Sequence, residues 1–150
     1  MKEGRIRPMT QGDVGEVLAI DRAVFSMPWS EESFRTYLHR PEAIFLVAEE
    51  PGRITGYASV LVAADQGDIA NVAVRAEHRR KKIGSALVEE LIRRAKERGV
   101  RSLFLEVRKS NTAAIALYTG FGFAPVGERK RYYHDPVEDA VIMCREEGKE

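Results

Sequence analysis

The sequence predicts an α/β fold in which helices pack on a mixed sheet, and two observations support this prediction. Patterns typical of strands alternate with patterns typical of helices along the chain. From residue 69 onwards the order is strand, basic loop, helix, strand, helix and strand, which is a βαβ-type layout. The 150 residues are 44% hydrophobic and 31% charged, which suits one domain with a sizeable core over residues 1–150.

Two helix starts are predicted before residue 40. Thr10 is suited to cap a helix whose apolar residues fall on one face. Ser30 is suited to cap a second, short helix that ends near Leu38, because two acids follow it in the first turn. Trp29 and Phe34 flank this second start at the spacing of a hydrophobic staple, which favours a sharp chain entry there.

Three strands are predicted in the middle of the chain. Residues 44–48 and 54–62 are rich in apolar and β-branched side chains, and the Pro51-Gly52 turn between them predicts a hairpin. Residues 69–74 form a third apolar strand.

An amphipathic helix is predicted over residues 84–98. Its apolar residues share one face, and the pairs Glu89–Arg93 and Glu90–Arg94 are spaced to form ion pairs on the opposite face. Gly99 is suited to end this helix in a left-handed conformation.

The last third of the chain continues the alternation. Residues 102–107 are predicted to form a strand, and Asn111 or Thr112 caps a helix that runs through Tyr118. The glycines in residues 120–123 break that helix before a further strand, and residues 140–144 form the last one, with Cys144 as a buried apolar side chain.

The charge balance argues against several classes of protein. With a net charge of +1, nothing points to a nucleic-acid or membrane-surface partner. The sequence has no apolar stretch of the kind found in a signal peptide or a membrane-spanning helix, and one cysteine fits a reducing compartment. The three histidines show no metal-ligand spacing. We therefore expect a cytoplasmic protein, a monomer or weak oligomer, that uses no metal.

Four basic residues, 79–82, directly precede the helix at 84–98. A helix start already carries unpaired N–H groups and a partial positive charge, so added bases are unfavourable unless an anion lies among them. Ligands of such folds bind beyond the carboxyl ends of the strands, where this cluster is placed. The cluster predicts a phosphorylated ligand, and the alternative is a solvated basic loop.

These residues resemble the pyrophosphate loop of the GCN5-related N-acetyltransferases (GNAT), whose pattern is Gln or Arg, two variable residues, Gly, one variable residue, and Gly or Ala. Residues 79–84 read Arg-Arg-Lys-Lys-Ile-Gly, so Lys82 replaces the first glycine. Residues 71–74 before the loop, and 105–111, 114–118 and 120–123 after it, follow the order and spacing of the family. Over nearly the whole chain, the sequence most resembles the RimI-type ribosomal-protein-alanine N-acetyltransferases.

The resemblance implies a single N-acetyltransferase domain over residues 1–150, with a splayed mixed sheet of six to seven strands and helices on both faces. It implies acetyl-CoA as cosubstrate and direct transfer, in a ternary complex, to the N-terminal amine of a ribosomal or other protein. The residues that it places at acetyl-CoA are Val72, Ala73, Val74, Arg79, Arg80, Lys81, Lys82, Ile83, Gly84, Ser85 and Asn111.

The chemistry of acetyl transfer can be checked against individual residues. Glu106 is the only charged residue within 102–107, so it is a candidate general base, acting through water if the amine is not within reach. Tyr118, with an ordinary pKa of about 10, is a candidate proton donor to the leaving thiolate. The alternatives are a solvent-facing carboxylate and a core aromatic ring. The resemblance implies the catalytic role for both.

A splayed or bulged strand after Asn71 would leave a backbone N–H, such as that of Val74, free to polarise the acetyl carbonyl.

Trp29, Tyr132 and Tyr133 are predicted to contact a peptide substrate, and a polar hairpin face with ordinary aromatic packing is the alternative for the two tyrosines. An α-amine with a pKa of about 8 is roughly a tenth neutral at pH 7, whereas a lysine amine with a pKa of about 10.4 is neutral about once in a few thousand. A mild base therefore favours N-terminal acetylation. The other candidate functions are acetylation of small amines or lysine side chains, and a catalytically idle CoA-binding module.

Overall fold

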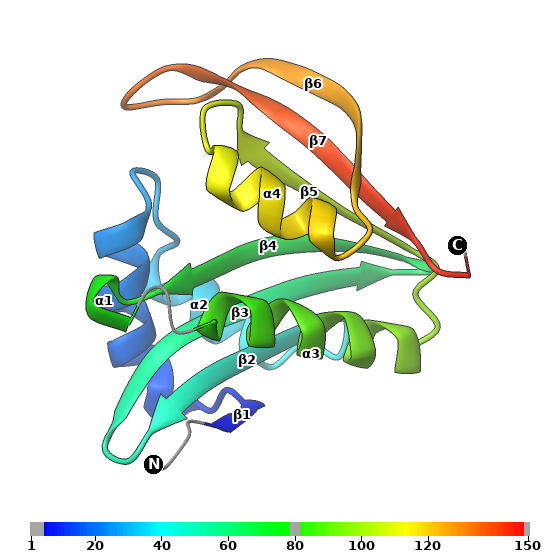
Figure 1. Ribbon diagram of the computed structural model, residues 1–150. Helices are drawn as coiled ribbons and strands as arrows, with labels where there is room; N and C mark the ends of the chain where they lie inside the picture. Colours follow the sequence, from blue (N-terminus) through cyan, green and yellow to red (C-terminus); the bar gives the residue numbers. More distant parts are fainter. Residues whose placement is uncertain (1–4, 79–81, 149–150) are drawn as a thin grey trace.

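Seven strands form one mixed sheet in the order β1-β2-β3-β4-β5-β7-β6, with helices on both faces (Figure 1). The computed structural model describes residues 5–78 and 82–148. The strands are β1 (Arg5–Pro8), β2 (Ala43–Glu50), β3 (Arg53–Ala63), β4 (Gln66–Val74), β5 (Ser102–Arg108), β6 (Ala124–Tyr133) and β7 (Glu138–Glu146). The α-helices are α1 (Val14–Val24), α2 (Glu31–Leu38), α3 (Ile83–Glu97) and α4 (Thr112–Gly120). The predicted fold class and the predicted β4–α3–β5 crossover are confirmed.

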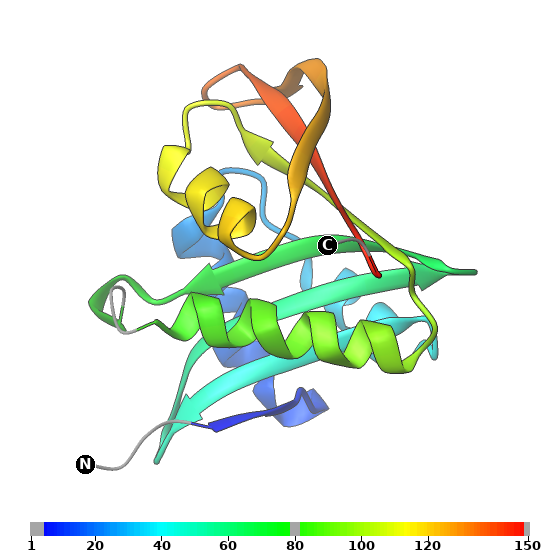
Figure 2. The ribbon, with the colours of Figure 1, turned by 45° about the vertical axis from the view of Figure 1, so that its right-hand side comes forward.

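The parallel pairing between β4 and β5 is very short. Gln66, Gly67 and Asp68 pair with Ser102, Leu103 and Phe104, and the ladder ends there. Beyond it, β4 stays on β3 as far as Val74, and β5 stays on β7 as far as Arg108. The two strands therefore diverge, as Figures 1 and 2 show. We call this place, beyond Asp68 and Phe104, the divergence point.

A β-bulge in β4 lies next to the divergence point. Ser59 pairs with Asn71 and Val60 pairs with Ile69, so Ala70 is an extra residue on β4. A bulge bends its strand and increases the local twist, which turns β4 away from β5. The irregularity expected near Asn71 is thus present.

Each face of the sheet has its own core. On one face α3 and α4 cover a cluster that includes Leu87, Leu91 and Leu105. On the other face α1 and α2 cover a cluster that includes Val17 and Phe34. The predicted Ser30 cap explains where α2 starts, since its hydroxyl accepts from the Ser33 N–H at 3.1 Å. Thr10 instead caps the short 3-10 turn Gln11–Asp13, and α1 follows with Asp13 as its N-cap. No helix in the two described ranges is long and apolar enough to cross a membrane.

Two details differ from the sequence-based expectation. Strand β1 was not predicted, because its four residues include a single large aliphatic side chain, that of Ile6, and it is defined by pairing with β2. The Glu90–Arg94 ion pair is confirmed at 2.7 Å, but the Glu89–Arg93 prediction is wrong. Arg93 instead pairs with Glu90 and Glu97, because its guanidinium reaches two carboxylates at once.

A buried carboxylate connects several elements on the face of the sheet that α1 and α2 cover. Asp21, at the end of α1, is fully buried. One of its oxygens accepts from the Tyr57 hydroxyl and, at 3.2 Å, from the Asn71 amide, and the other accepts from the Trp29 backbone N–H at 2.7 Å. Burial raises the pKa of Asp21, and these three hydrogen bonds oppose the shift. The carboxylate therefore connects α1, β3, the bulged part of β4 and the loop before α2.

We expect Asp21→Asn to lower the free energy of unfolding by about 1–3 kcal/mol, because an amide cannot accept from all three donors and leaves one buried and unpaired. The raised pKa means that the Asp21 contribution is largest at low pH and decreases as the pH rises through its folded value. The difference in the free energy of unfolding between wild type and variant should therefore be larger near pH 4.5 than at pH 7. Denaturant titration at both pH values measures this difference. Asp65→Asn, at an exposed turn, is the control and should leave stability unchanged.

Candidate active site

The candidate catalytic residues come from β5 and α4. Leu103, Leu105 and Val107 are buried under α3 and α4, so the intervening Glu106 points to the other face of the sheet, where α1 and α2 pack. The Glu106 side chain is 29% exposed and lies two residues beyond Phe104, the last β5 residue that pairs with β4. Tyr118, on α4, lies within the opposite core. The two residues therefore lie on opposite faces of the sheet.

Tyr118 sits in an apolar environment. It is 8% exposed, and its ring packs on Phe123 with 5.6 Å between the centroids. Burial, with a smaller contribution from nearby Tyr133, raises the pKa of its hydroxyl far above the usual range. The hydroxyl therefore stays protonated at neutral pH and is able to donate a proton.

Glu106 has a cationic neighbour that the sequence analysis did not identify. The Arg129 Nε, on β6, donates to Glu106 Oε2 at 3.1 Å. Arg129 also lies 5.9 Å from the centre of the Tyr132 ring. Because the arginine is paired with Glu106, the carboxylate is held towards the β6–β7 hairpin.

The predicted acetyl-CoA residues fall on two adjacent elements. Val72, Ala73 and Val74 lie on β4 beyond its last pair with β5, so this edge of β4 has no strand partner within the described ranges. Gly84, in the first turn of α3, faces Val74: a side-chain carbon placed there would lie 3.8 Å from Val74 Cγ2. Ile83 and Ser85 lie in the same turn.

The loop before α3 is only partly described. Arg79, Arg80 and Lys81 lie outside the described residues. Lys82 is the N-cap of α3 and adopts a left-handed conformation, with φ 62° and ψ 22°, in which glycine is favoured. It makes no side-chain capping hydrogen bond, so the first N–H groups of α3 receive none from it. The lysine thus keeps the backbone conformation that glycine favours.

Asn111 has a structural role. Its side-chain oxygen accepts from the Ala114 N–H at 3.1 Å, so it is the cap of α4, in preference to Thr112. This capping contact fixes where α4 begins and therefore where Tyr118 is placed.

The predicted substrate residues lie in two different parts of the fold. The Trp29 ring packs against the rings of Phe34, Tyr37 and Phe45 at 5.3, 5.5 and 6.0 Å, so it contributes to the core beneath α2. Tyr132 and Tyr133 lie at the end of β6, and Tyr132 is 42% exposed. Only the two tyrosines are brought near Glu106, whose charge contributes to raising the pKa of both.

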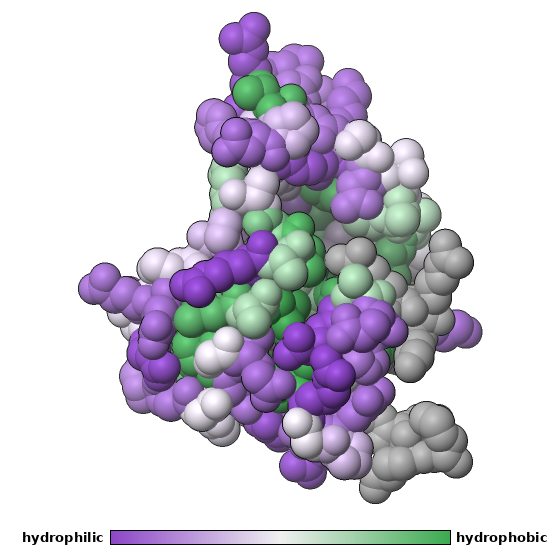
Figure 3. All heavy atoms as spheres, turned by 90° about the vertical axis from the view of Figure 1, so that its left-hand side faces the viewer, coloured by the Kyte–Doolittle hydropathy of each residue, from purple (hydrophilic) through white to green (hydrophobic). Residues whose placement is uncertain are grey.

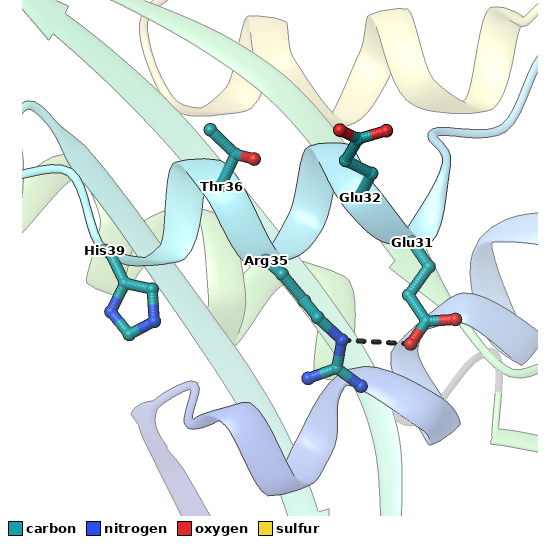
Figure 4. A pocket seen from close by; sticks show the side chains of 5 residues that line it. All are labelled: Glu31, Glu32, Arg35, Thr36 and His39. Atoms are coloured by element: carbon teal, nitrogen blue, oxygen red, sulfur yellow. Dashed lines mark hydrogen bonds and ion pairs between the residues drawn. The ribbon is translucent and has the colours of Figure 1, made fainter.

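The surface agrees with this arrangement. Figure 3 looks onto the end of the molecule where β4 and β5 are furthest apart, and the surface there is hollowed beneath the β6–β7 hairpin, with hydrophobic side chains gathered in the hollow. A second hollow runs along the outer side of α2 and is lined by Glu31, Glu32, Arg35, Thr36 and His39 (Figure 4). In that hollow Arg35 pairs with Glu31 at 2.9 Å, and none of the five residues is a predicted site residue.

Sequence reasoning missed Arg129, which pairs with Glu106, Arg108, which lies on the same face of β5, and Asp21, which joins α1, β3 and β4. Arg129 is one of a run of basic residues in β6, and a single sequence does not show which of them meets Glu106. Asp21 had a usable signal, since it is an acid at the end of an apolar helix face. No group of three or more His, Cys, Asp or Glu side chains suited to a metal ion is found in residues 5–78 and 82–148.

Comparison with known proteins identifies relatives. The acetyltransferase (GNAT) family model matches residues 14–123. A protein of Bacillus subtilis (strain 168), named provisionally as a ribosomal protein bS18-alanine N-acetyltransferase, is 39% identical over 92% of this chain and 92% of its own. The enzyme of that name from Escherichia coli (strain K12) is 37% identical over 88% of this chain and 90% of its own. A crystal structure of the Escherichia coli ribosomal-protein-S18-alanine N-acetyltransferase has a TM-score of 0.88 at 34% identity, covering 95% of this chain and 93% of that one.

We expect Lys82→Gly to raise the free energy of unfolding by about 0.5–1 kcal/mol, because relief of the left-handed conformation exceeds the added chain entropy of glycine. Lys96→Gly, inside the last turn of α3, is the matched control and should lower it by about 1 kcal/mol. Denaturant titration measures both variants. A loss of stability in Lys82→Gly would contradict the strain assigned to this position.

Proposed function

This chain belongs to the acetyltransferase (GNAT) family, and we propose that it transfers the acetyl group of acetyl-CoA to the N-terminal amine of a protein, with the alanine of ribosomal protein bS18 as the first candidate. The observation that carries this proposal is the placement of Glu106 and Tyr118 on opposite faces of the sheet, with Glu106 two residues beyond the divergence point. An acceptor amine and a thioester that enter from opposite faces would meet between these two side chains. A ribosomal substrate also implies a cytoplasmic location.

The residues present fit acetyl-CoA. The first turn of α3 is left without a side-chain cap, and Lys82 adds a positive charge beside it, which suits the pyrophosphate. The free edge of β4 at residues 72–74 is able to donate backbone N–H groups to the pantetheine arm and the acetyl carbonyl. When bound, acetyl-CoA supplies the activated thioester.

Two side chains of the protein then accept and donate the protons of the reaction. Glu106 accepts a proton from the acceptor ammonium, directly or through water, so that the amine becomes a nucleophile. As the C–N bond forms and the C–S bond breaks, the Tyr118 hydroxyl donates its proton to the leaving thiolate, and the proton that the acylated nitrogen loses restores the hydroxyl. The apolar surroundings of Tyr118 keep that proton on the oxygen until it is needed.

The acceptor class follows from the same chemistry. Glu106 is a half-exposed carboxylate, which is a mild base. A mild base suits an α-amine, because its pKa of about 8 lies well below the value of about 10.4 for lysine. The exposed Tyr132 and the neighbouring hairpin offer a surface for an extended peptide next to Glu106.

The proposed function is tested by CoA release from acetyl-CoA with two peptides. One carries the first residues of ribosomal protein bS18 with a free N-terminal alanine, and the other is the same peptide with a blocked terminus and an added internal lysine. We expect release with the free terminus only. Release with the blocked peptide would instead indicate lysine acetylation, and release with neither, despite binding of acetyl-CoA, would contradict protein acetylation.

We expect Glu106→Gln and Tyr118→Phe each to lower kcat by about 10²–10⁴-fold, with little change in the KM for acetyl-CoA, because each removes a proton-transfer group. Glu89→Gln on the exposed side of α3 and Tyr37→Phe on α2 are matched controls that should keep full activity. Steady-state kinetics at saturating peptide measure the effect. Near-normal kcat in either variant would remove that residue from the mechanism.

The pH profile provides a separate test of Tyr118. We expect the rate to rise through about pH 8, as the acceptor α-amine loses its proton. We expect no decline up to about pH 10, because the raised pKa of Tyr118 keeps its hydroxyl protonated where an ordinary tyrosine would be half ionised. Rates are corrected for thioester hydrolysis, and circular dichroism monitors folding. A decline between pH 8 and 10 in the folded enzyme would contradict the assignment of Tyr118.

A further inference from the structure

Arg108 joins two surface segments next to β5, the strand that carries Glu106. It lies on β5 two residues after Glu106, so both side chains point to the same face of the sheet. Its Nη2 donates at 3.0 Å to Ser26 Oγ, in the loop after α1, and at 3.0 Å to the His134 carbonyl, in the β6–β7 turn. Its Nη1 donates at 2.9 Å to the Pro136 carbonyl in the same turn.

Further contacts orient the guanidinium. It lies 4.6 Å from the centre of the Tyr133 ring, and its Nη1 is 3.3 Å from Glu138 Oε1. The Ser26 hydroxyl also donates to the His134 carbonyl at 2.9 Å, which joins residues 108 positions apart in the chain. In Figure 1 the loop after α1 reaches up towards the β6–β7 hairpin at this place. Arg108, Ser26 and the 134–136 turn therefore form one hydrogen-bonded unit, which we call the Arg108 bridge.

The bridge needs the chemistry of arginine. The planar guanidinium donates to four acceptors at once while its face lies on an aromatic ring, which the compact ammonium of lysine cannot reproduce. The Arg108 side chain is 23% exposed, and its hydrogen bonds to Ser26, His134 and Pro136 lie at the surface. The arginine thus holds two surface loops at fixed positions relative to each other and to β5, the strand that carries Glu106.

Exposed large hydrophobic side chains lie in or next to the bridged segments. Of the four in the described ranges, Met27 follows Ser26, Tyr132 precedes Tyr133, and Val137 follows Pro136. Exposed apolar side chains gathered around a polar centre mark an interaction surface. By fixing the segments, the bridge fixes these three side chains relative to Glu106.

We propose that Arg108 is a positioning residue for the protein substrate: it preorganises the two segments that hold the acceptor peptide against Glu106. This inference rests on the proposed function and adds to it a residue that does not touch the reacting atoms. Segments that are already ordered lower the entropic cost of peptide binding, so the bridge acts on that step, whereas the residues proposed for acetyl-CoA lie on β4 and at the start of α3.

The test compares Arg108→Gln with Arg145→Gln, a matched control. Arg145, on β7, is 25% exposed, donates to the Phe121 carbonyl at 2.8 Å and pairs with Glu147 at 2.7 Å, far from the bridged segments in the fold. We expect Arg108→Gln to raise the KM for the alanine peptide by about tenfold or more, with kcat within about threefold and an unchanged KM for acetyl-CoA. Arg108→Lys should restore little of the peptide binding, so its KM for the alanine peptide should stay close to that of Arg108→Gln. Arg145→Gln should change the melting temperature and leave all three kinetic constants unchanged.

A second variant keeps the inference testable if Arg108→Gln does not fold. Ser26→Ala removes one acceptor of the bridge and one link to His134, and should raise the KM for the peptide by about two- to fivefold in a folded protein. The inference is overturned if the wild type acetylates the peptide while the bridge variants show the same KM as Arg145→Gln. A wild type that acetylates no peptide overturns the proposed function itself, and the role of Arg108 with it.

Discussion

The three-pair ladder between β4 and β5 is the constraint on which the rest of the molecule depends. It is long enough to fix the parallel crossover through α3 and too short to hold the strands together beyond Asp68. The extra residue Ala70 adds twist where pairing ends, so the separation is part of the backbone itself. A continuous sheet would bury the free edge of β4 and would leave no route between the two faces.

Once the sheet is divided in this way, each half needs its own means of holding its position. On the β1–β4 side, the buried carboxylate of Asp21 joins α1, β3 and β4 and also fixes the chain at Trp29. On the β5–β7 side, Glu106 and Arg108 project from the same strand face and are held by partners in β6 and in the β6–β7 turn. The Ser26–His134 hydrogen bond connects the two halves directly. Charged groups thus supply the rigidity that a longer ladder would otherwise provide.

Local sequence signals were enough to predict most elements, because caps and turns act over a few residues. Ser30, Asn111 and Gly99 are local signals of this kind, and each marks a helix end within about a residue. Glu106 and Tyr118 were candidates on local grounds, but a solvent-facing carboxylate and a core ring fitted the same residues, and the family resemblance favoured the catalytic roles. The partner of Glu106 was not predictable, because Arg129 meets it only through the β5-β7-β6 strand order, which no local pattern encodes. Lys82 shows a related limit, as its left-handed backbone is visible only in three dimensions.

The strand order also determines when during synthesis the molecule can be completed. β6 is made before β7, yet it joins the sheet through β7, which lies between β5 and β6. A growing chain that has reached residue 133 therefore carries an unpaired strand until residues 138–146 leave the ribosome. During that interval Arg129 has no fixed place beside Glu106. The fold thus delays assembly of its charged centre until the last strand is inserted, and a nascent chain that lacks this strand also lacks Met143, which is fully buried in the core under α3 and α4.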